Sequence, residues 1–142
     1  MRVKTFLFKT EPSEYSFDDM LRDERCTWDG VTSAAALIAL RSCGKGDEVF
    51  IYHTGGEKRI VGLAKVVSAP RPDPDAADER RVVVDLRAVR AVKVPVTLAE
   101  IKADRRFADF ALVKQSRLST MEVPPPLVEP LQRMLGEPSG KK

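Results

Sequence analysis

The residues best suited to chemistry lie near the start of the chain, where Lys9, Thr10 and Glu11 follow an apolar run. This run predicts a buried strand over Thr5–Phe8, and Pro12 restricts Glu11 to an extended or turn conformation. A cation, a hydroxyl and a carboxylate at the exit of a strand are held by a rigid scaffold, and binding sites are often built there. The ordinary alternative is that Glu11 caps a backbone group while Lys9 is solvated.

The single tryptophan, Trp28, offers a flat aromatic surface a few residues further on. Its surroundings, Cys26-Thr27 and Asp29-Gly30, show no helical periodicity, so we expect Trp28 in a loop. An indole presented by a loop can stack on a nucleobase, an interaction worth about 1–3 kcal/mol per base. Core packing is the alternative for Trp28, because tryptophan is highly buried on average, and an Asx-turn is the alternative for Asp29.

Polar groups beside this aromatic surface would orient a bound base. Carboxylates accept hydrogen bonds from exocyclic amines, and this role is open to Glu11 and Asp29. Donors to ring carbonyls are available from the side chains of Lys9 and Thr10 and from the backbone near Gly30 and Val31.

Further candidates lie in later parts of the chain. Tyr15 and Tyr52 either line the same site or pack in the core with a satisfied hydroxyl. His53 ends an apolar run, and a lone histidine is more often a hydrogen-bonded structural residue than a catalyst. Arg117 contacts a phosphate or is a solvated cation. If the chain binds nucleic acid, we expect its affinity to fall only gently as the salt concentration rises, because few cations are placed to meet phosphates. These cations are Lys9, Arg59, Lys114 and Arg117.

Bulk properties limit the function classes. The 142 residues suffice for one domain with a substantial core, and the net charge of +3 permits nucleic-acid binding without requiring it. Cys26 and Cys43 lack Cys-x-x-Cys spacing and cannot complete a zinc set with the single His53, so we expect no metal and no cofactor. No apolar run suits a secretory or membrane-spanning segment. We therefore expect a cytoplasmic protein with reduced thiols and no membrane partner.

Capping motifs predict where helices begin. Ser16 with Asp19 and Thr97 with Glu100 form capping boxes, and Ser33 is a further candidate N-cap. The expected helices cover 17–21, 34–41 ending near Gly44, 98–103, and a terminal segment from the prolines 124–126 to 135. The alanine-rich helix over 34–41 should be buried on more than one side.

Apolar runs bounded by turn residues predict the strands. A hairpin is expected from 48–53 and 59–67, in which Gly62 indicates a bulge or a close approach by another group. Other expected features are strands over 81–89 and 119–123, a proline-rich loop over 70–78, and a short turn near Phe107 and Phe110. Regular β-α alternation is missing, so an α+β barrel or sandwich is expected rather than a doubly wound sheet.

Five separated segments, in one order, resemble the EVE-domain family of the PUA-like superfamily, which is related to YTH and ASCH domains. They are Lys9-Thr10-Glu11-Pro12-Ser13, Trp28-Asp29-Gly30-Val31, Val49–Thr54, Ile60-Val61-Gly62 and Ser116–Ser119. The resemblance extends from about Lys4 to Val123. It implies an α+β fold: a PUA-like mixed β-barrel of about five to six strands with short flanking helices. A single domain is expected over 1–136, with a frayed tail over 137–142.

For function, the resemblance implies a non-catalytic module that binds DNA or RNA and accepts a modified, flipped nucleobase in a pocket. The expected site residues are Lys9, Thr10, Glu11, Tyr15, Trp28, Asp29, Gly30, Val31, Tyr52, His53, Arg117 and Ser119. Many relatives carry an arginine and an asparagine after Trp-Asp-Gly-Val, where this chain has Thr32 and Ser33. A charged contact beside the pocket is therefore missing at these positions.

Two other function classes stay open. The same pocket could serve a small metabolite or a protein partner, because a net charge of +3 attracts phosphates only weakly. A small hydrolase or transferase would need Cys26 or Cys43 beside His53 and an orienting third group, and the spacing does not indicate such a set. We expect a monomer.

Overall fold

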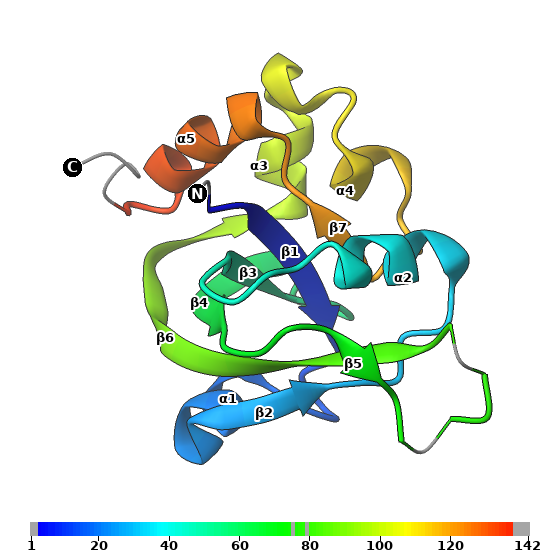
Figure 1. The fold of residues 1–142 in the computed structure, drawn as a ribbon. Coiled ribbons are helices and arrows are strands. Elements are labelled where there is room, and N and C mark those ends of the chain that lie inside the picture. The colour runs from blue at the N-terminus through cyan, green and yellow to red at the C-terminus, as the bar shows by residue number, and fades with distance from the viewer. Residues whose placement is uncertain (1–2, 75, 79, 138–142) are drawn as a thin grey trace.

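The strands form one curled half-barrel in the computed structural model, which describes residues 3–74, 76–78 and 80–137 (Figure 1). They are β1 (Thr5–Thr10), β2 (Arg25–Trp28), β3 (Glu48–His53), β4 (Arg59–Val66), β5 (Arg71–Pro72), β6 (Val82–Thr97) and β7 (Thr120–Glu122). The order across the sheet is β2-β6-β4-β3-β1-β7, with β5 attached to β6. β1 and β3 are parallel and the other described pairs are antiparallel, so the sheet is mixed.

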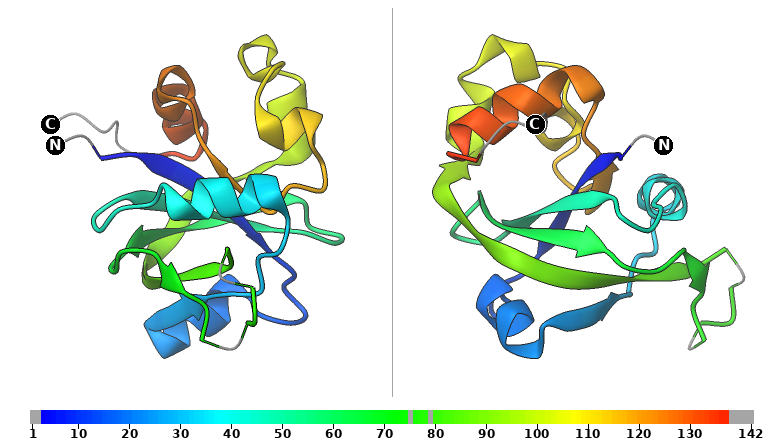
Figure 2. Two further views of the ribbon diagram at one scale, coloured as in Figure 1. Left: turned by 45° about the vertical axis from the view of Figure 1, so that its right-hand side comes forward. Right: turned by 60° about the vertical axis from the view of Figure 1, so that its left-hand side comes forward.

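Short helices flank this sheet (Figures 1 and 2). α1 (Phe17–Asp23) lies at the lower end of the half-barrel in Figure 1, and α2 (Ala34–Arg41) lies beside β7. The upper end carries α3 (Leu98–Lys102), the 3-10 helix η1 (Arg105–Phe107), α4 (Ala111–Lys114) and α5 (Pro125–Met134). Every helix in the described ranges is too short or too polar to span a membrane.

Capping by side chains sets where three of these helices begin, as predicted. In α1, the Ser16 hydroxyl accepts from the Asp19 backbone N–H at 3.0 Å, and the Asp19 carboxylate accepts from the Ser16 N–H at 2.9 Å. Thr97 and Glu100 form the same reciprocal pair at the start of α3. The Ser33 hydroxyl accepts from a backbone N–H in the first turn of α2. These bonds satisfy donors that a helix leaves free at its N-terminus.

The central strands are buried on both faces, which explains their continuous apolar sequences. In β3, Val49 and Ile51 belong to a cluster that we call the first core, formed with α1, α2 and β2. Phe50 and Tyr52 belong to the second core, which lies beneath the helices of the upper end. The sheet is therefore a shared wall between two cores.

β6 continues well beyond Val89, where the predicted strand ends. Its first half faces the first core with Val84 and Leu86, and its second half faces the second core with Val92 and Val96. The register against β4 shifts at two places, so the strand can turn from one core to the other. These irregularities interrupt the two-residue alternation on which the prediction depended.

Two predictions about α2 are wrong. Its C-cap is Ser42 in a right-handed conformation, so Gly44 is not a left-handed terminator of the helix. The helix also buries one face only, because Ile38 is 63% exposed while Leu37 and Leu40 are buried.

The chain differs from prediction at two further points. The proline-rich loop contains the short strand β5, in which Arg71 and Pro72 pair with β6. The predicted frayed tail begins too early, because Glu137 is buried and forms an ion pair with Arg90. Residues 138–142 of that predicted tail lie outside the described residues.

Gly62 in β4 lies directly against the ring of Phe17, the first residue of α1. A Cβ atom at Gly62 would lie 2.5 Å from three carbons of this ring, so the missing side chain is what lets α1 pack on β4. The Phe17 backbone N–H also donates to His53 Nε2 at 3.0 Å, and the other ring nitrogen of His53 bonds Glu57 at 2.9 Å. Both contacts hold the start of α1 against the hairpin.

We predict that Gly62→Ala destabilises the protein by about 1–3 kcal/mol, because the added methyl group displaces the Phe17 ring from a close-packed site. Thermal unfolding measures this change. Gly56→Ala is the matched control, since a Cβ there meets nothing within 4 Å, and it should leave the melting temperature unchanged or slightly raised. Equal melting temperatures for the two variants would contradict the packing role of Gly62.

Candidate functional site

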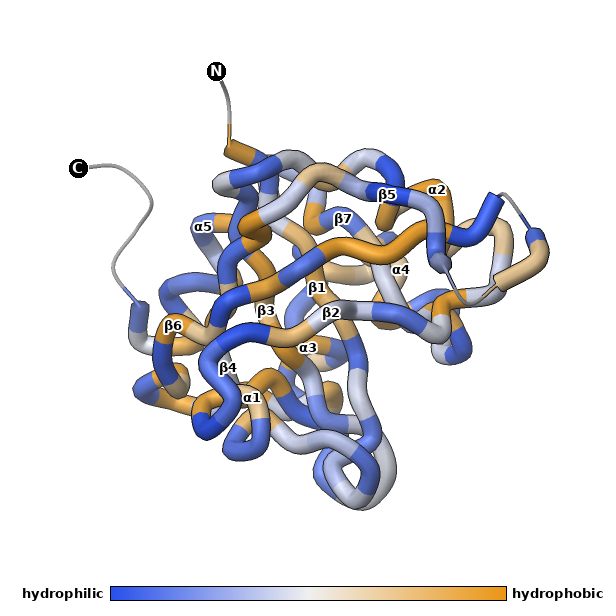
Figure 3. Tube along the Cα trace, turned by 60° about the horizontal axis from the view of Figure 1, so that its bottom comes forward, coloured by the Kyte–Doolittle hydropathy of each residue, from blue (hydrophilic) through white to orange (hydrophobic). Residues whose placement is uncertain are grey.

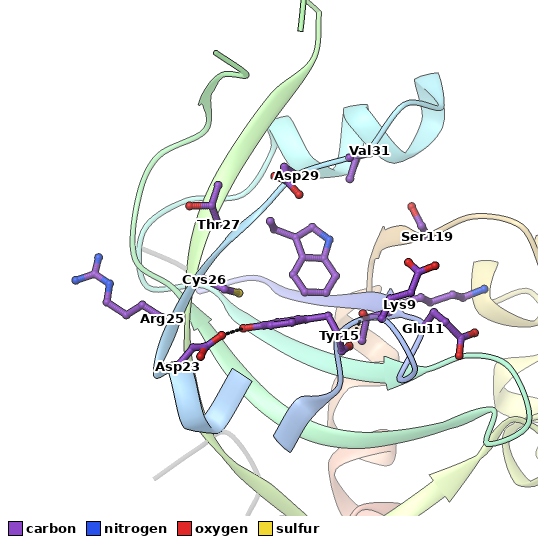
Figure 4. A pocket seen from close by; sticks show the side chains of 14 residues that line it. Lys9, Glu11, Tyr15, Asp23, Arg25, Cys26, Thr27, Asp29, Val31 and Ser119 are labelled. Carbon is purple, nitrogen blue, oxygen red and sulfur yellow. Dashed lines mark hydrogen bonds between the residues drawn. The ribbon is translucent and has the colours of Figure 1, made fainter. Parts of the chain in front are cut away.

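A cavity of about 660 Å³ opens between the end of β1, strand β2 and the loop that follows β2 (Figure 4). Its lining consists of Lys9, Thr10, Glu11, Glu14, Tyr15, Asp23, Arg25, Cys26, Thr27, Trp28, Asp29, Gly30, Val31 and Ser119. Every predicted site residue except Tyr52, His53 and Arg117 lies in this lining. Figure 4 shows the β2 side chains on one side and Lys9, Glu11 and Ser119 on the other.

The end of β1 holds one wall of the cavity. The Thr10 hydroxyl donates to the Tyr15 carbonyl at 2.7 Å, which closes the turn that carries Glu11. The Glu11 carboxylate accepts from the Ser13 backbone N–H at 3.3 Å and from the Thr54 hydroxyl at 3.2 Å. The bond from Ser13 is the main cause that lowers the pKa of Glu11. Glu11 is thus an oriented, ionised acceptor at the mouth of the cavity.

Lys9 ties this wall to the segment that precedes β7. Its ammonium donates to the Ser116 carbonyl at 3.0 Å and lies 5.6 Å from the centre of the Tyr52 ring. Burial lowers the pKa of Lys9. At least one of its three donors is therefore used within the protein, beside the Tyr52 ring.

Trp28 lies in a strand, which corrects the predicted loop. It is the last residue of β2 and pairs with Val84 of β6. The side chain is 9% exposed, and its ring centre lies 5.3 Å from that of Phe8 in a tilted arrangement. Trp28 therefore packs in the first core, as the alternative of the sequence analysis stated, and it also lines the cavity.

The cavity lining holds a polar pair, Tyr15 and Asp23, of which the sequence analysis named only Tyr15. The Tyr15 hydroxyl donates to Asp23 at 3.0 Å, as the dashed line in Figure 4 shows. Burial raises the pKa of Tyr15, and burial also raises the pKa of the Cys26 thiol to about 11. Both groups are thus neutral and positioned by packing.

The unpredicted lining residues come from the turn before α1, the end of α1 and strand β2, namely Glu14, Asp23, Arg25, Cys26 and Thr27. Four residues are too few for a clear periodic signal, so β2 was not predicted. The available signal was alternation, because Cys26 and Trp28 face the first core while Arg25 and Thr27 are exposed.

The structure places three predicted residues outside the cavity. Tyr52 is 3% exposed and belongs to the second core, on the opposite face of the sheet. His53 is buried between Phe17 and Glu57, where it joins α1 to the hairpin. Arg117 lines a separate hollow of about 350 Å³ together with Ser33. Burial keeps Tyr52 and His53 from contacting a ligand, whereas Arg117 is exposed.

The charge of the cavity lining is acidic although the whole chain is basic. Four carboxylates, Glu11, Glu14, Asp23 and Asp29, stand against two cations, Lys9 and Arg25. Asp29 is exposed and has neither a hydrogen bond nor an ion pair within the described part of the chain. Such a lining accepts hydrogen bonds from amines and repels phosphate. No cluster of metal-binding side chains occurs among the described residues.

Comparisons with known proteins agree with this architecture. Rpa0253 from Rhodopseudomonas palustris is 38% identical, with 94% of each chain covered and a TM-score of 0.88. Atu2648 from Agrobacterium tumefaciens is 29% identical, with 99% of each chain covered and a TM-score of 0.91. The human THYN1 protein, solved in complex with 5-methylcytosine-containing DNA, is 23% identical, with coverage of 95% and 99% and a TM-score of 0.85.

These likenesses extend over nearly the whole chain and confirm the predicted PUA-like arrangement of a mixed sheet with short flanking helices. A search of curated proteins found no match. The family model of the EVE domain matches residues 4–134. Since this match covers most of the sequence, the chain belongs to the EVE-domain family.

Proposed function

We propose that this protein is a non-catalytic reader of nucleic acid whose cavity takes a modified, flipped base that carries an exocyclic amine. The observation that supports this proposal is the cavity of about 660 Å³, whose lining contains both Trp28 and the carboxylate of Asp29, which is unpaired within the described residues. Its volume falls in the range of pockets that enclose small organic ligands, about 300–1,000 Å³.

A flipped base needs both stacking and hydrogen bonds, because leaving its stack costs a few kcal/mol. Stacking on the Trp28 ring offsets about 1–3 kcal/mol of this cost. Glu11 and Asp29 supply acceptors for the amine, and Lys9 supplies a donor for a ring carbonyl. The acidic lining also keeps phosphates out, so the base enters while the backbone stays outside.

The likeness to the THYN1 complex supports nucleic acid as the class of ligand. That protein was solved with DNA containing 5-methylcytosine. Cytosine bears its amine at N4, which is a donor that an acceptor-rich cavity suits, whereas thymine presents carbonyls at its edge. We therefore infer that cytosine or adenine derivatives bind more tightly than thymine or uracil derivatives.

A Cys/His enzyme is the weaker alternative. Burial raises the pKa of Cys26 to about 11 and that of Cys43 to about 12, so neither thiol is activated as a nucleophile at neutral pH. Both ring nitrogens of His53 are engaged, one with the Phe17 N–H and one with Glu57. These features favour a binding role.

We predict slow alkylation of Cys26 in the folded protein. With a pKa near 11 instead of about 8.5, its thiolate fraction at pH 7 is roughly 300-fold lower than that of a free cysteine. Iodoacetamide labelling followed by mass spectrometry should show a rate that rises about tenfold per pH unit up to pH 10. Urea-unfolded protein is the control, and fast labelling of the native thiol at pH 7 would favour the enzyme.

We predict that Asp29→Asn weakens binding of the preferred oligonucleotide by about 1.5–3 kcal/mol, or roughly 10- to 150-fold in Kd. The reason is the loss of a charged acceptor for the amine, and stability should hardly change because Asp29 is exposed and unpaired in the described residues. Fluorescence anisotropy with modified and unmodified DNA measures the effect.

Glu129→Gln is the control for Asp29→Asn, since it removes one negative charge from α5, outside the cavity. Equal affinities of the two variants would count against Asp29 as a ligand contact. A free modified nucleoside that binds as tightly as the oligonucleotide would instead support the small-metabolite alternative.

We predict that substitution of Trp28 affects both the stability of the fold and the affinity for the oligonucleotide. Trp28→Ala should lower the free energy of unfolding by about 3–5 kcal/mol, because it removes a ring packed on Phe8 in the first core. Trp28→Phe preserves most of this packing, so it should stay folded while binding the oligonucleotide more weakly through its smaller stacking surface. Melting curves beside the titrations separate the effects. Full-strength binding by folded Trp28→Phe would argue against stacking.

A further inference from the structure

Three cations stand in one row across three neighbouring strands. Lys65 of β4 pairs in register with Arg87 of β6, and Arg87 pairs in register with Arg25 of β2. All three residues are exposed. Neighbouring strands lie about 4.8 Å apart, so these residues, which we call the cationic row, extend over about 10 Å.

The cationic row lies on the outer face of the sheet. Successive residues of a strand point to opposite faces, and the neighbours Ala64, Leu86 and Cys26 all point into the first core. The three cations therefore point away from that core. Figure 3 shows β2 and β6 near the viewer, with hydrophilic and hydrophobic residues alternating along them.

The cations of this row are only partly offset by nearby carboxylates of the described residues, because Glu48 stands opposite Lys65 and the charge of Arg25, after the Arg71 hydrogen bond, contributes to lowering the pKa of Asp85. None of them forms an ion pair there, and Glu48, which pairs in register with Lys65 from β3, makes no ion pair with it. The nearby carboxylate of Asp85 is engaged by Arg71 at 3.0 Å. Like charges placed directly opposite on neighbouring strands repel, so Arg87, which lies between Arg25 and Lys65, gains most from a bound anion, whereas Lys65 also faces the opposite charge of Glu48.

The cations expected from sequence to meet phosphates are largely occupied. Arg59 is paired with Glu57 at 3.2 Å, and Lys114 is paired with Asp109 at 3.2 Å. Lys9 donates to the Ser116 carbonyl. Carboxylates outnumber cations in the cavity lining, so the backbone of a nucleic acid needs a further cationic surface.

We propose that the cationic row binds the sugar–phosphate backbone of the same nucleic acid whose base enters the cavity. This inference rests on the proposed function. Arg25 belongs to both the row and the cavity lining, so the two surfaces are continuous. A row of about 10 Å is long enough to face neighbouring phosphates of one strand, since these follow one another every 3.4 Å along the axis of duplex DNA.

The test compares two double variants that each remove two positive charges. Lys65→Gln with Arg87→Gln alters the row and spares the cavity lining. Lys102→Gln with Arg105→Gln is the control, because these exposed residues belong to α3 and η1 at the other end of the molecule. Fluorescence anisotropy with duplexes that contain 5-methylcytosine or cytosine is measured between 50 and about 200 mM salt.

For the row variant, the slope of log K against log salt should fall by about 1.8, or by about 1.4 on single strands, and affinity at about 100 mM salt should fall at least tenfold. The control should keep the wild-type slope. The ratio of affinities for methylated and unmethylated DNA should stay the same, because phosphate contacts carry no direct sequence information.

Arg87→Glu separates binding from stability. It places a negative charge between Lys65 and Arg25, so the melting temperature should rise while the affinity for DNA falls further than in the row variant. A loss of binding in a more stable protein excludes misfolding as its cause.

The outcomes distinguish the two proposals. Wild-type protein that binds no oligonucleotide defeats the proposed function itself. Wild-type protein that binds DNA, with equal slopes for the row variant and its control, overturns only the role of the row. A row variant that loses affinity for polyglutamate but keeps its affinity for DNA also overturns it, in favour of an acidic protein partner.

Discussion

The close contact between the Phe17 ring and the backbone of Gly62 is the constraint on which the site depends. It sets α1 against β4, and the His53 bond to the Phe17 N–H secures the same position. The turn before α1 carries Glu11 and Tyr15, and the residues after α1 enter β2. The distance between the two cavity walls, the turn before α1 and strand β2, therefore depends on how closely the Phe17 ring approaches β4.

Charge is divided between two surfaces, and in the proposed function this division gives each surface a different task. The cavity lining is acidic and suits the amine edge of a base, whereas the cationic row outside it is unpaired among the described residues and suits phosphates. A net charge of +3 hides this arrangement, because the two surfaces nearly cancel. Recognition of a base and attraction of a backbone can thus be altered by separate substitutions.

In the proposed function, Trp28 links stability to recognition. The ring packs on Phe8 in the first core and also forms a wall of the cavity. A side chain held by core packing has little freedom to move, so the stacking surface is in place before a ligand arrives. The same arrangement makes the site sensitive to core substitutions near β2.

The sequence by itself determined the elements whose signals are local. The capping boxes at Ser16 and Thr97, the apolar run of β1 and the hairpin of β3 and β4 are all present, since caps and periodicity involve residues within a few positions of each other. Most of the cavity lining was also predictable, because it follows from the exit of β1 and the residues around Trp28.

Only the tertiary structure decided which side chains meet across strands. β2 is too short to show its period, β6 changes face through register shifts, and Tyr52 turns to the opposite core. The cationic row consists of Arg25, Lys65 and Arg87, which come from three distant segments of the chain. Only the register of the paired strands places them side by side. Strand register depends on partners far away in the chain, and no local pattern contains that information.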